Sequence, residues 1–234
     1  MTLDTPPDYV SVTADEFPAV AALFAGMARR RITEVHLHHT FTPTHEIFNT
    51  VAEERGGDAM AAGLELCRGM WRFHVEDRDF ADIAQHVSID PVGRIWLNRN
   101  WDRPPASCSG FNGDQARGPF MIETIGNFDQ GCDVLDGDQR HAVLCVIAGV
   151  QRACGLAPDA LVFHNDMTDL KSCPGTGVDK AEVLGEVALM FDRIGAAGEA
   201  DVPVDRKTAM ETMFRAFMAT DFGALKDGPL GGPA

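Results

Sequence analysis

Clusters of positive charge are missing from this 234-residue sequence, in which 35 acidic residues face 20 basic ones. The formal net charge is −15, and no run rich in lysine or arginine is present. Nucleic acids and anionic membrane surfaces attract clustered positive charge. We therefore expect neither of them as a partner.

Long apolar runs are missing as well. No unbroken apolar stretch approaches the ~18 residues that a membrane span requires. The first eight residues carry neither the basic segment nor the apolar segment of a secretion signal. The sequence therefore predicts a soluble chain, made in the cytoplasm without a signal peptide and without a membrane span. A target outside the cell would have to be reached by another route.

The six cysteines do not indicate disulfides, although their number is even. Without a secretion signal, reduced thiols are expected. Cys145 and Cys154 lie in an apolar helical pattern typical of small core residues. Only Cys173 has neighbours that are typical of a metal site.

The length and the 45% hydrophobic content allow a substantial core. One domain of roughly 150–180 residues with terminal extensions fits this length better than two domains. The pattern predicts a helical N-terminal extension over residues 1–30 and a main domain over 31–195. A linker, a helix and a flexible tail are expected over 196–234, and no internal repeat is found.

Strands and helices alternate along the main domain. The α/β (α+β) class is expected, with a central mixed sheet flanked by helices. A hairpin is predicted where Asp90-Pro91-Val92-Gly93 offers proline and glycine at the positions that a type I turn favours. Gly56 and Gly57 are a possible break in the second helix. The expected strands are 32–39, 84–89, 94–97, 120–125 and 160–164, and the expected helices are 14–30, 45–74, 137–155, 178–194 and 206–220.

A split pattern of metal-ligand residues is the most informative feature of the chain. The first predicted strand ends in His36-Leu37-His38-His39, and alternation places His36 and His38 on one face. His164 ends the last predicted strand, and Cys173 follows in a loop. Two histidines and a cysteine hold zinc with one position open for water. The spacing differs from that of zinc fingers, so a hydrolytic zinc enzyme is indicated.

An ordered set of motifs resembles a known family. The segments in question are Val35 to Thr42, Asp82 to Val87, Gly110-Phe111-Asn112, the strand before Gly126, and His164 with Lys171-Ser172-Cys173-Pro174-Gly175. Together they are similar to the zinc-dependent type 2 N-acetylmuramoyl-L-alanine amidases, a family that includes phage amidase lysozymes and peptidoglycan recognition proteins. The resemblance covers about residues 32–190.

The resemblance implies one catalytic Zn²⁺ ion held by His38, His164 and Cys173. The implied reaction is cleavage of the amide between N-acetylmuramic acid and L-alanine, in peptidoglycan or in soluble muropeptides. Lys171 would stabilise the oxyanion of the tetrahedral intermediate, a role that commonly contributes ~2.7–4 kcal/mol. A merely solvated loop lysine is the plain alternative.

The residue expected to act as the general base differs from the one used in part of the family. Phage-type members have a tyrosine before the histidine of the hairpin motif, where this chain has Gln85, which cannot transfer a proton. Other members use a glutamate from the strand that leads to a glycine, and Glu123 occupies that position before Gly126. A lone carboxylate in an apolar strand is costly unless it has a partner or a function. The alternatives for Glu123 are a solvent-facing position and a salt bridge with an arginine.

Three further residues are predicted to bind the substrate: His39, His86 and Asn112. His86 could instead pack in the sheet, and Asn112 could only shape its loop. Three tryptophans, Trp71, Trp96 and Trp101, could line a sugar groove or pack in the core.

Three functions follow from these patterns. The first is a zinc amidase, acting as an endolysin on the cell wall after release, as a cytoplasmic recycling enzyme or as a delivered effector. The second is a non-catalytic peptidoglycan-binding module on the same fold. The third is a cysteine hydrolase that uses Cys173, for which the Cys173-Pro174 context is poor and which leaves the metal ligands without a purpose.

Overall fold

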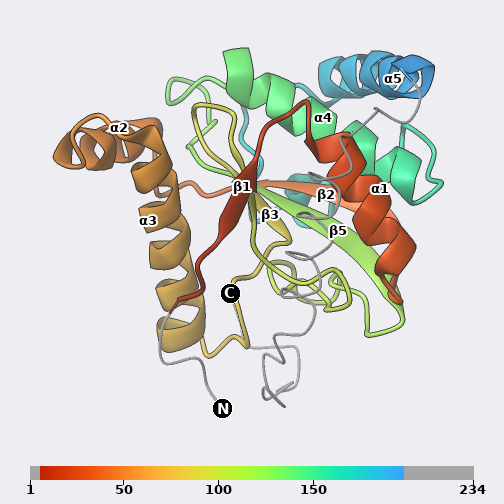
Figure 1. Ribbon diagram of the computed structural model, residues 1–234, viewed down its shortest axis with the longest axis horizontal. Coiled ribbons are helices and arrows are strands. Elements are labelled where there is room, and N and C mark those ends of the chain that lie inside the picture. The colour runs from red at the N-terminus through yellow and green to blue at the C-terminus, as the bar shows by residue number, and fades with distance from the viewer. Residues whose placement is uncertain (1–5, 198–234) are drawn as a thin grey trace, which may run out of the picture.

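A six-stranded mixed sheet lies at the centre of the fold in the computed structural model, which describes residues 6–197 (Figure 1). The strand order is β1-β4-β3-β5-β2-β6. The pairs β1–β4 and β4–β3 are antiparallel, whereas β3–β5, β5–β2 and β2–β6 are parallel. The predicted α/β class with a mixed sheet is confirmed. The strands are β1 Val10–Val12, β2 Arg31–His39, β3 Val87–Ile89, β4 Ile95–Leu97, β5 Arg117–Thr124 and β6 Leu161–Phe163.

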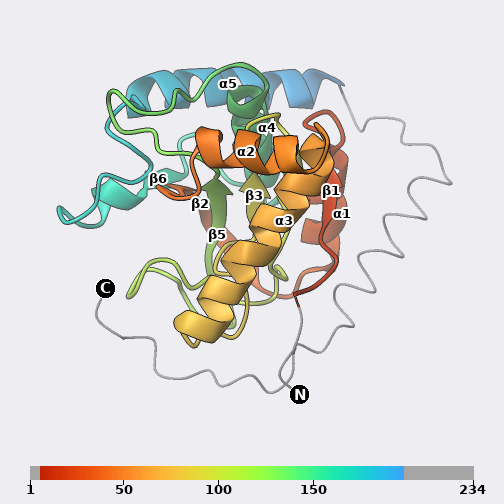
Figure 2. The same ribbon diagram turned by 90° about the vertical axis from the view of Figure 1, so that its left-hand side faces the viewer.

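Helices cover both faces of this sheet, as the two views in Figures 1 and 2 show. One face carries α1 (Phe17–Met27), α4 (Gly137–Ala153) and α5 (Lys180–Ala197). The other face carries α2 (His45–Glu54) and α3 (Ala59–Arg72). A π-helical turn, η1 (Phe73–Asp77), follows α3, and a 3₁₀ turn, η2 (His164–Asp166), follows β6.

The predicted helix over 45–74 is divided in two at the glycine pair. Gly56 and Gly57 have φ angles of 73° and 85°, a conformation that glycine adopts at little cost. Thr44 caps α2 by accepting a hydrogen bond from the Ile47 amide, and Asp58 caps α3 in the same way. The break that the sequence indicated is therefore confirmed.

The strand β1 was not anticipated in the N-terminal region, where the sequence predicted only helix. Its three residues pair with β4 at the edge of the sheet. Three residues are too few to give a visible alternation of apolar and polar side chains. The helix expected over 206–220 and the tail lie outside the described residues, so the domain boundaries remain predictions. No helix within residues 6–197 is long and apolar enough to cross a membrane.

Two apolar clusters stabilise the two helical layers. The larger one packs α1, α4 and α5 against the sheet around side chains such as Phe17, Phe120 and Val146. The smaller one lies under α3 and includes Trp71 and Trp96. All three tryptophans are buried, so they pack in the core and do not line a groove. All six cysteines are free thiols, as expected.

The hairpin β3–β4 is held by the buried Asp90 carboxylate. Its Oδ1 accepts hydrogen bonds from the amides of Val92 and Arg94, and its Oδ2 accepts one of 2.8 Å from the Trp96 indole. The Gly93 amide donates to the Asp90 carbonyl oxygen, which closes the predicted turn. This carboxylate therefore joins the turn to the apolar cluster under α3.

Gly63 is the point at which α3 approaches this hairpin. A Cβ atom at Gly63 would lie 2.6 Å from Asp90 Oδ2 and 2.6 Å from Trp96 Cζ2. We expect Gly63→Ala to lower the free energy of unfolding by about 1–3 kcal/mol, because overpacking outweighs the helix preference of alanine. The matched control is Gly69→Ala in the same helix, where no atom lies within 4 Å. Urea unfolding should show the control to be as stable as the wild type or more so, and equal effects of the two changes would contradict the close approach.

Candidate active site

The carboxyl ends of three parallel strands meet at one edge of the fold. In the register of β2 with β5, His38 pairs with Glu123, and in the register of β2 with β6, Leu37 pairs with Phe163. His164 therefore begins one residue beyond the end of β6, beside His38. Ligands commonly bind outside the carboxyl ends of parallel strands. The register alone brings His38, Glu123 and His164 together.

His38, His164 and Cys173 form a compact cluster of potential metal ligands. Their ligand atoms all lie within 4.8 Å of one another. The Cys173 Sγ and His38 Nδ1 atoms are 3.6 Å apart, and the two imidazole centroids are 4.7 Å apart. A tetrahedral zinc ion with Zn–S about 2.3 Å and Zn–N about 2.0–2.1 Å separates sulfur and nitrogen by roughly 3.5 Å. The donor set and its spacing fit zinc.

The protonation of these side chains is set mainly by burial. Burial lowers the pKa of His38 well below its usual value, and burial together with the positive charge of Lys171 lowers the pKa of His164. Both imidazoles are therefore neutral, which is the ligating form. Burial raises the pKa of the Cys173 thiol, although the His39 amide donates to its sulfur at 3.3 Å. A protonated thiol is a poor nucleophile, which weighs against the cysteine hydrolase.

A cavity of about 500 Å³ opens over this cluster. His38, His164, Cys173 and Glu123 lie in its lining. The remaining walls come from four separate parts of the chain: residues 39–41, residues 73–85 in and after η1, residues 106–107 and residues 170–172. The pocket is large enough for a small molecule or a short peptide.

Glu123 is the acidic group of this pocket. Glu123 is only 6% exposed, and its Oε1 atom has no hydrogen-bond partner within residues 6–197. Burial raises its pKa to about 8. Neither a solvent-facing position nor a salt bridge with arginine is observed in the described part of the chain. A buried carboxyl group with a perturbed pKa in a pocket is typical of a proton-transfer residue.

Lys171 lies at the wall of the pocket next to the metal-ligand cluster. Its charge adds to the effect of burial on His164, whose pKa is lowered. The same charge partly opposes the effect of burial on Cys173, whose pKa is raised. Its residue is exposed, and it forms no ion pair with any carboxylate of the described residues. The ammonium group is therefore available for a negative charge that develops in the pocket.

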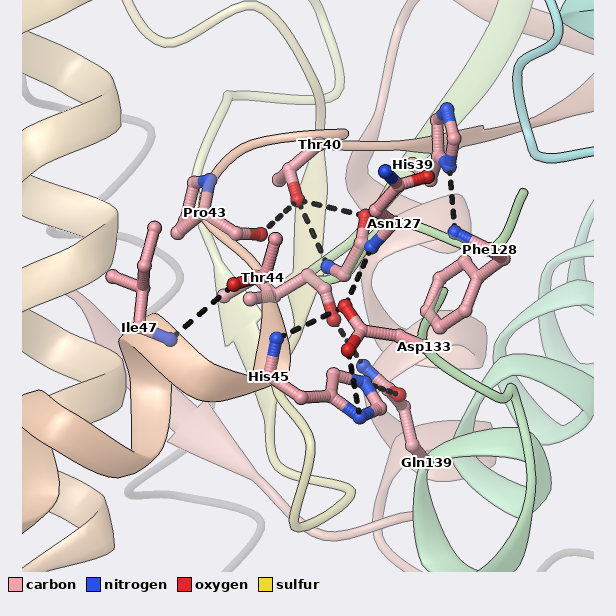
Figure 3. A network of polar contacts seen from close by, with 12 residues as sticks. His39, Thr40, Pro43, Thr44, His45, Ile47, Asn127, Phe128, Asp133 and Gln139 are labelled. Carbon is pink, nitrogen blue, oxygen red and sulfur yellow. Dashed lines mark hydrogen bonds and ion pairs between the residues drawn. The ribbon is translucent and has the colours of Figure 1, made fainter. Parts of the chain in front are cut away.

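His39 contacts the backbone through one of its ring nitrogens. Its Nδ1 accepts a hydrogen bond of 3.2 Å from the Phe128 amide (Figure 3). Burial lowers its pKa to about 4. The neutral ring therefore carries its proton on Nε2, and His39 is one of the residues that line the pocket.

A polar network fixes the segments that follow β2 and β5 (Figure 3). Thr40 Oγ1 accepts from the Gly126 amide at 2.9 Å and donates to the Pro43 carbonyl oxygen at 2.7 Å. Asp133 Oδ2 accepts from the amides of His45 and Asn127. These bonds tie the two strand ends to each other and to the start of α2, which holds the histidine pair in place.

Phe41 follows this network in a strained conformation. Its φ angle is 59°, its amide donates to the Gly126 carbonyl oxygen, and the side chain is 55% exposed at the pocket. A non-glycine residue with positive φ is costly and is found most often at functional sites. Sequence analysis did not identify Phe41, because the pattern carries no signal for such strain.

The structure does not bring His86 and Asn112 to the pocket. His86 Nδ1 accepts from the Met121 amide, its Nε2 contacts the Arg103 carbonyl oxygen at 3.1 Å, and its ring stacks on Phe120. Asn112 Oδ1 accepts from the Cys108 amide at 2.9 Å. Backbone groups therefore occupy both side chains, so that they pack the sheet and shape the loop.

Arg30 fixes the long loop that contains Asn112. Its buried guanidinium donates to the carbonyl oxygens of Asp114, Pro119 and Asn112 at 2.9, 3.1 and 3.1 Å. This loop also contains residues 106–107 of the pocket wall, and the three bonds fix its later part, between Asn112 and Pro119. No sequence signal pointed to Arg30.

The six-stranded mixed sheet flanked by helices is a fold that solved peptidoglycan recognition proteins share. Bumblebee peptidoglycan recognition protein SA is similar over 77% of this chain and 87% of that chain, with 17% identity and a TM-score of 0.53. Peptidoglycan recognition protein LE in complex with tracheal cytotoxin is similar over 74% and 84%, with 21% identity and a TM-score of 0.51.

The N-acetylmuramoyl-L-alanine amidase LysCS from Clostridium intestinale is also a structural neighbour, with 17% identity over 69% of this chain and 85% of that chain and a TM-score of 0.47. The fold assignment rests on the two recognition proteins, and it confirms the fold that the sequence motifs implied. No family model matches the sequence, and no curated protein does.

The raised pKa of Glu123 has a consequence for stability. The unfolded carboxyl group ionises near its ordinary value of 4.5, whereas the folded group ionises at about 8. Between these values the unfolded state binds fewer protons at this group, so the contribution of Glu123 to the stability of the metal-free protein falls as the pH rises. Asp82 and Asp90 titrate at about 6 and add little to this loss above pH 6, whereas the buried histidines with lowered pKa values act in the opposite direction, because they lose protons near 6.5 only in the unfolded state.

We therefore expect the change in unfolding free energy from pH 6 to pH 8 to be about 1–2 kcal/mol more favourable in Glu123→Gln than in the wild type, in chelator-treated protein. Urea unfolding at the two pH values measures it. Glu54→Gln, an exposed residue of α2, is the control and should behave as the wild type. An unchanged pH dependence in Glu123→Gln would show that this carboxyl group ionises normally.

Proposed function

We propose that the protein is a zinc-dependent N-acetylmuramoyl-L-alanine amidase. Its substrate would be the amide between N-acetylmuramic acid and L-alanine, in peptidoglycan or in muropeptides. The single observation that carries this proposal is the presence of the His38, His164 and Cys173 cluster and the unpaired Glu123 carboxyl group in one pocket. Such a set is costly to bury and has no use in packing alone.

A zinc ion held by His38, His164 and Cys173 would supply Lewis acidity toward the amide carbonyl and the attacking water. Glu123 accepts a proton from that water and delivers it to the amino group of the departing L-alanine. A group with a pKa near neutrality is suited to both directions of transfer. The apolar surroundings that raise its pKa also exclude bulk water from the transfer.

Lys171 supplies the positive charge for the tetrahedral intermediate. Its ammonium group lies beside the ligand cluster and has no carboxylate partner in the described residues. It would donate a hydrogen bond to the oxyanion as the carbonyl carbon becomes tetrahedral. His39, which lines the pocket and carries its proton on Nε2, would hold a carbonyl group of the substrate.

A recognition module that binds peptidoglycan fragments without cleaving them is the second candidate. It is favoured by the neighbours that support the fold, which are recognition proteins, one of them in complex with tracheal cytotoxin, a monomeric diaminopimelic acid-type peptidoglycan. Binding alone would not require Glu123 to remain an unpaired carboxyl group. The two candidates are separated by hydrolysis.

The first test pairs metal content with cleavage. We expect the purified protein to hold about one zinc ion per chain and to release L-alanine amino groups from a soluble muramoyl-tripeptide. Cys173→Ala should lose both the zinc and the activity, because the thiolate is one of three ligands. Cys132→Ala, an exposed free thiol, is the matched control and should keep both.

Each outcome of this test is decisive. Zinc and binding without hydrolysis would favour the recognition module. Zinc that persists in Cys173→Ala would place the metal elsewhere. A wild-type protein without zinc, even after metal is supplied, would overturn the proposal.

Lys171 has a separate kinetic signature. We expect Lys171→Met to lower kcat by about 10²–10³-fold, the usual effect of removing one oxyanion donor, with little change in KM or zinc content. Lys171→Arg keeps the charge and should recover part of the rate. If Lys171→Met instead raised KM at constant kcat, the lysine would be a binding residue and would not act on the transition state.

A further inference from the structure

The segment that follows β5 contacts the loop that carries Cys173. Asp129 Oδ2 accepts a hydrogen bond of 3.0 Å from the Ser172 hydroxyl group, and its Oδ1 accepts one of 2.9 Å from the Thr176 amide. Ser172 and Thr176 lie on the two sides of Cys173 in the sequence. One carboxylate group therefore holds this loop both before and after the residue that bears the sulfur atom.

Backbone contacts bring the same two segments close together. Thr176 Oγ1 accepts from the Gln130 amide at 3.0 Å, and the Phe128 carbonyl oxygen accepts from the Gly177 amide at 2.8 Å. A Cβ atom at Gly175 would lie 2.4 Å from that carbonyl oxygen, and the φ angle of this glycine is 119°. Only glycine allows so close an approach in this conformation. The loop therefore lies directly against the segment that contains Asp129.

Cys173 has two further contacts, and both come from the histidine side of the site. Its Sγ accepts from the His39 amide at 3.3 Å, and its carbonyl oxygen accepts from the Asn165 amide at 2.8 Å. The His39 ring in turn accepts from the Phe128 amide (Figure 3). These bonds fix Cys173 relative to the ends of β2 and β6. The bonds to Asp129 fix the same loop from the side of β5.

Asp129 is suited to this task because its side chain is charged. The hydrogen bond from the Thr176 amide lowers the pKa of Asp129, so the group is a carboxylate at neutral pH. Hydrogen bonds to an ionised acceptor are stronger than those between neutral groups. Asp129 is not among the residues that line the pocket, so its effect on the site must pass through the loop.

We propose that Asp129 is a positioning residue, which holds the loop so that the Cys173 sulfur atom stands beside His38 before a metal ion binds. The distance of 3.6 Å between Cys173 Sγ and His38 Nδ1 is the arrangement that it maintains. A loop that is ordered in advance costs less free energy on binding than one that the metal ion must order. This inference rests on the proposed metal site, and it assigns to Asp129 a role that requires no contact with the reacting atoms.

The first test measures the zinc dissociation constant of the full-length protein by competition with a chelator. We expect Asp129→Ala to weaken zinc binding about 10–100-fold, the usual effect of removing a partner that orients a metal ligand. Asp129→Asn should stay within about threefold of the wild type, because its amide oxygen can accept from Thr176 and its amino group can donate to the Ser172 hydroxyl group. Recovery by asparagine would separate hydrogen bonding from charge.

A matched control and a second variant accompany this test. Asp114→Ala removes a carboxylate whose Oδ1 accepts from the amides of Ala116 and Arg117 at 2.8 and 2.9 Å, in a loop without metal ligands, and it should bind zinc as the wild type does. Ser172→Ala removes one of the bonds to Asp129 and should weaken zinc binding about threefold to tenfold. In the Asp129→Ala background the same change should have no effect, because the bond is already absent.

The second test needs no metal ion. Cys173 is only 8% exposed, so iodoacetamide should modify it in the metal-free protein only when the loop opens. We expect Asp129→Ala to raise the alkylation rate of Cys173 about tenfold, as followed by mass spectrometry of its peptide. Cys145, a buried thiol of α4, is the internal control and should react at the wild-type rate. General destabilisation of the fold would raise both rates.

Wild-type zinc affinity in Asp129→Ala, or equal acceleration of Cys145 and Cys173, would overturn the positioning role. Equal losses in Asp129→Ala and Asp129→Asn would assign the effect to charge and overturn it as well. A wild-type protein that binds no zinc would contradict the proposed function, whereas the alkylation rates would still test Asp129. Conversely, hydrolysis of muropeptides together with unchanged zinc affinity in Asp129→Ala would leave the amidase and remove the role of Asp129.

Discussion

The parallel pairing of β2 between β5 and β6 is the constraint on which the rest of the structure depends. Parallel strands begin and end together, so their register decides which residues stand side by side at the carboxyl ends. Here it sets His38 opposite Glu123 and places His164 just past the neighbouring strand. A slip of one residue would turn each of these side chains to the opposite face and disperse the cluster. The apolar face of the same strands, packed under α1 and α4, opposes such a slip.

Burying the polar groups of the pocket costs free energy, and the two apolar clusters offset this cost. The metal-free site buries a carboxyl group, a thiol and neutral imidazoles whose atoms are incompletely paired. The face of the sheet under α3 holds further buried polar side chains, Ser88 and Asn98, which contact the Cys67 thiol. A small apolar cluster under α3 and a larger one under α1, α4 and α5 surround this polar layer. The functional site therefore lies on one side of the sheet, and the larger apolar cluster that stabilises the fold packs on the other side.

Much of the fold and the core of the site could be predicted from the sequence. His38, His164 and Glu123 were found because they end or interrupt apolar strands, and Cys173 because of its neighbours in Lys171-Ser172-Cys173-Pro174-Gly175, and both signals are local in the sequence. The pocket walls formed by residues 73–85 and 106–107 could not be predicted, because they depend on how a π-helical turn and a long loop return to the sheet. His86 has the composition of a site residue but packs under the loop, since its ring nitrogens contact the backbone groups of Met121 and Arg103. The strand β1 was not predicted, because its three residues are too few to show an alternating pattern.

The distance along the chain between the metal-ligand residues has a consequence for how the protein acquires its site. His38 and Cys173 are 135 residues apart in sequence yet their ligand atoms are 3.6 Å apart. Contacts of such separation form late, because closing the intervening chain costs entropy first. During synthesis the first histidine is exposed to solvent long before its partners exist. A metal ion that binds only when all three ligands are in place would therefore stabilise the completely folded domain. It would not stabilise an incomplete or partly folded chain.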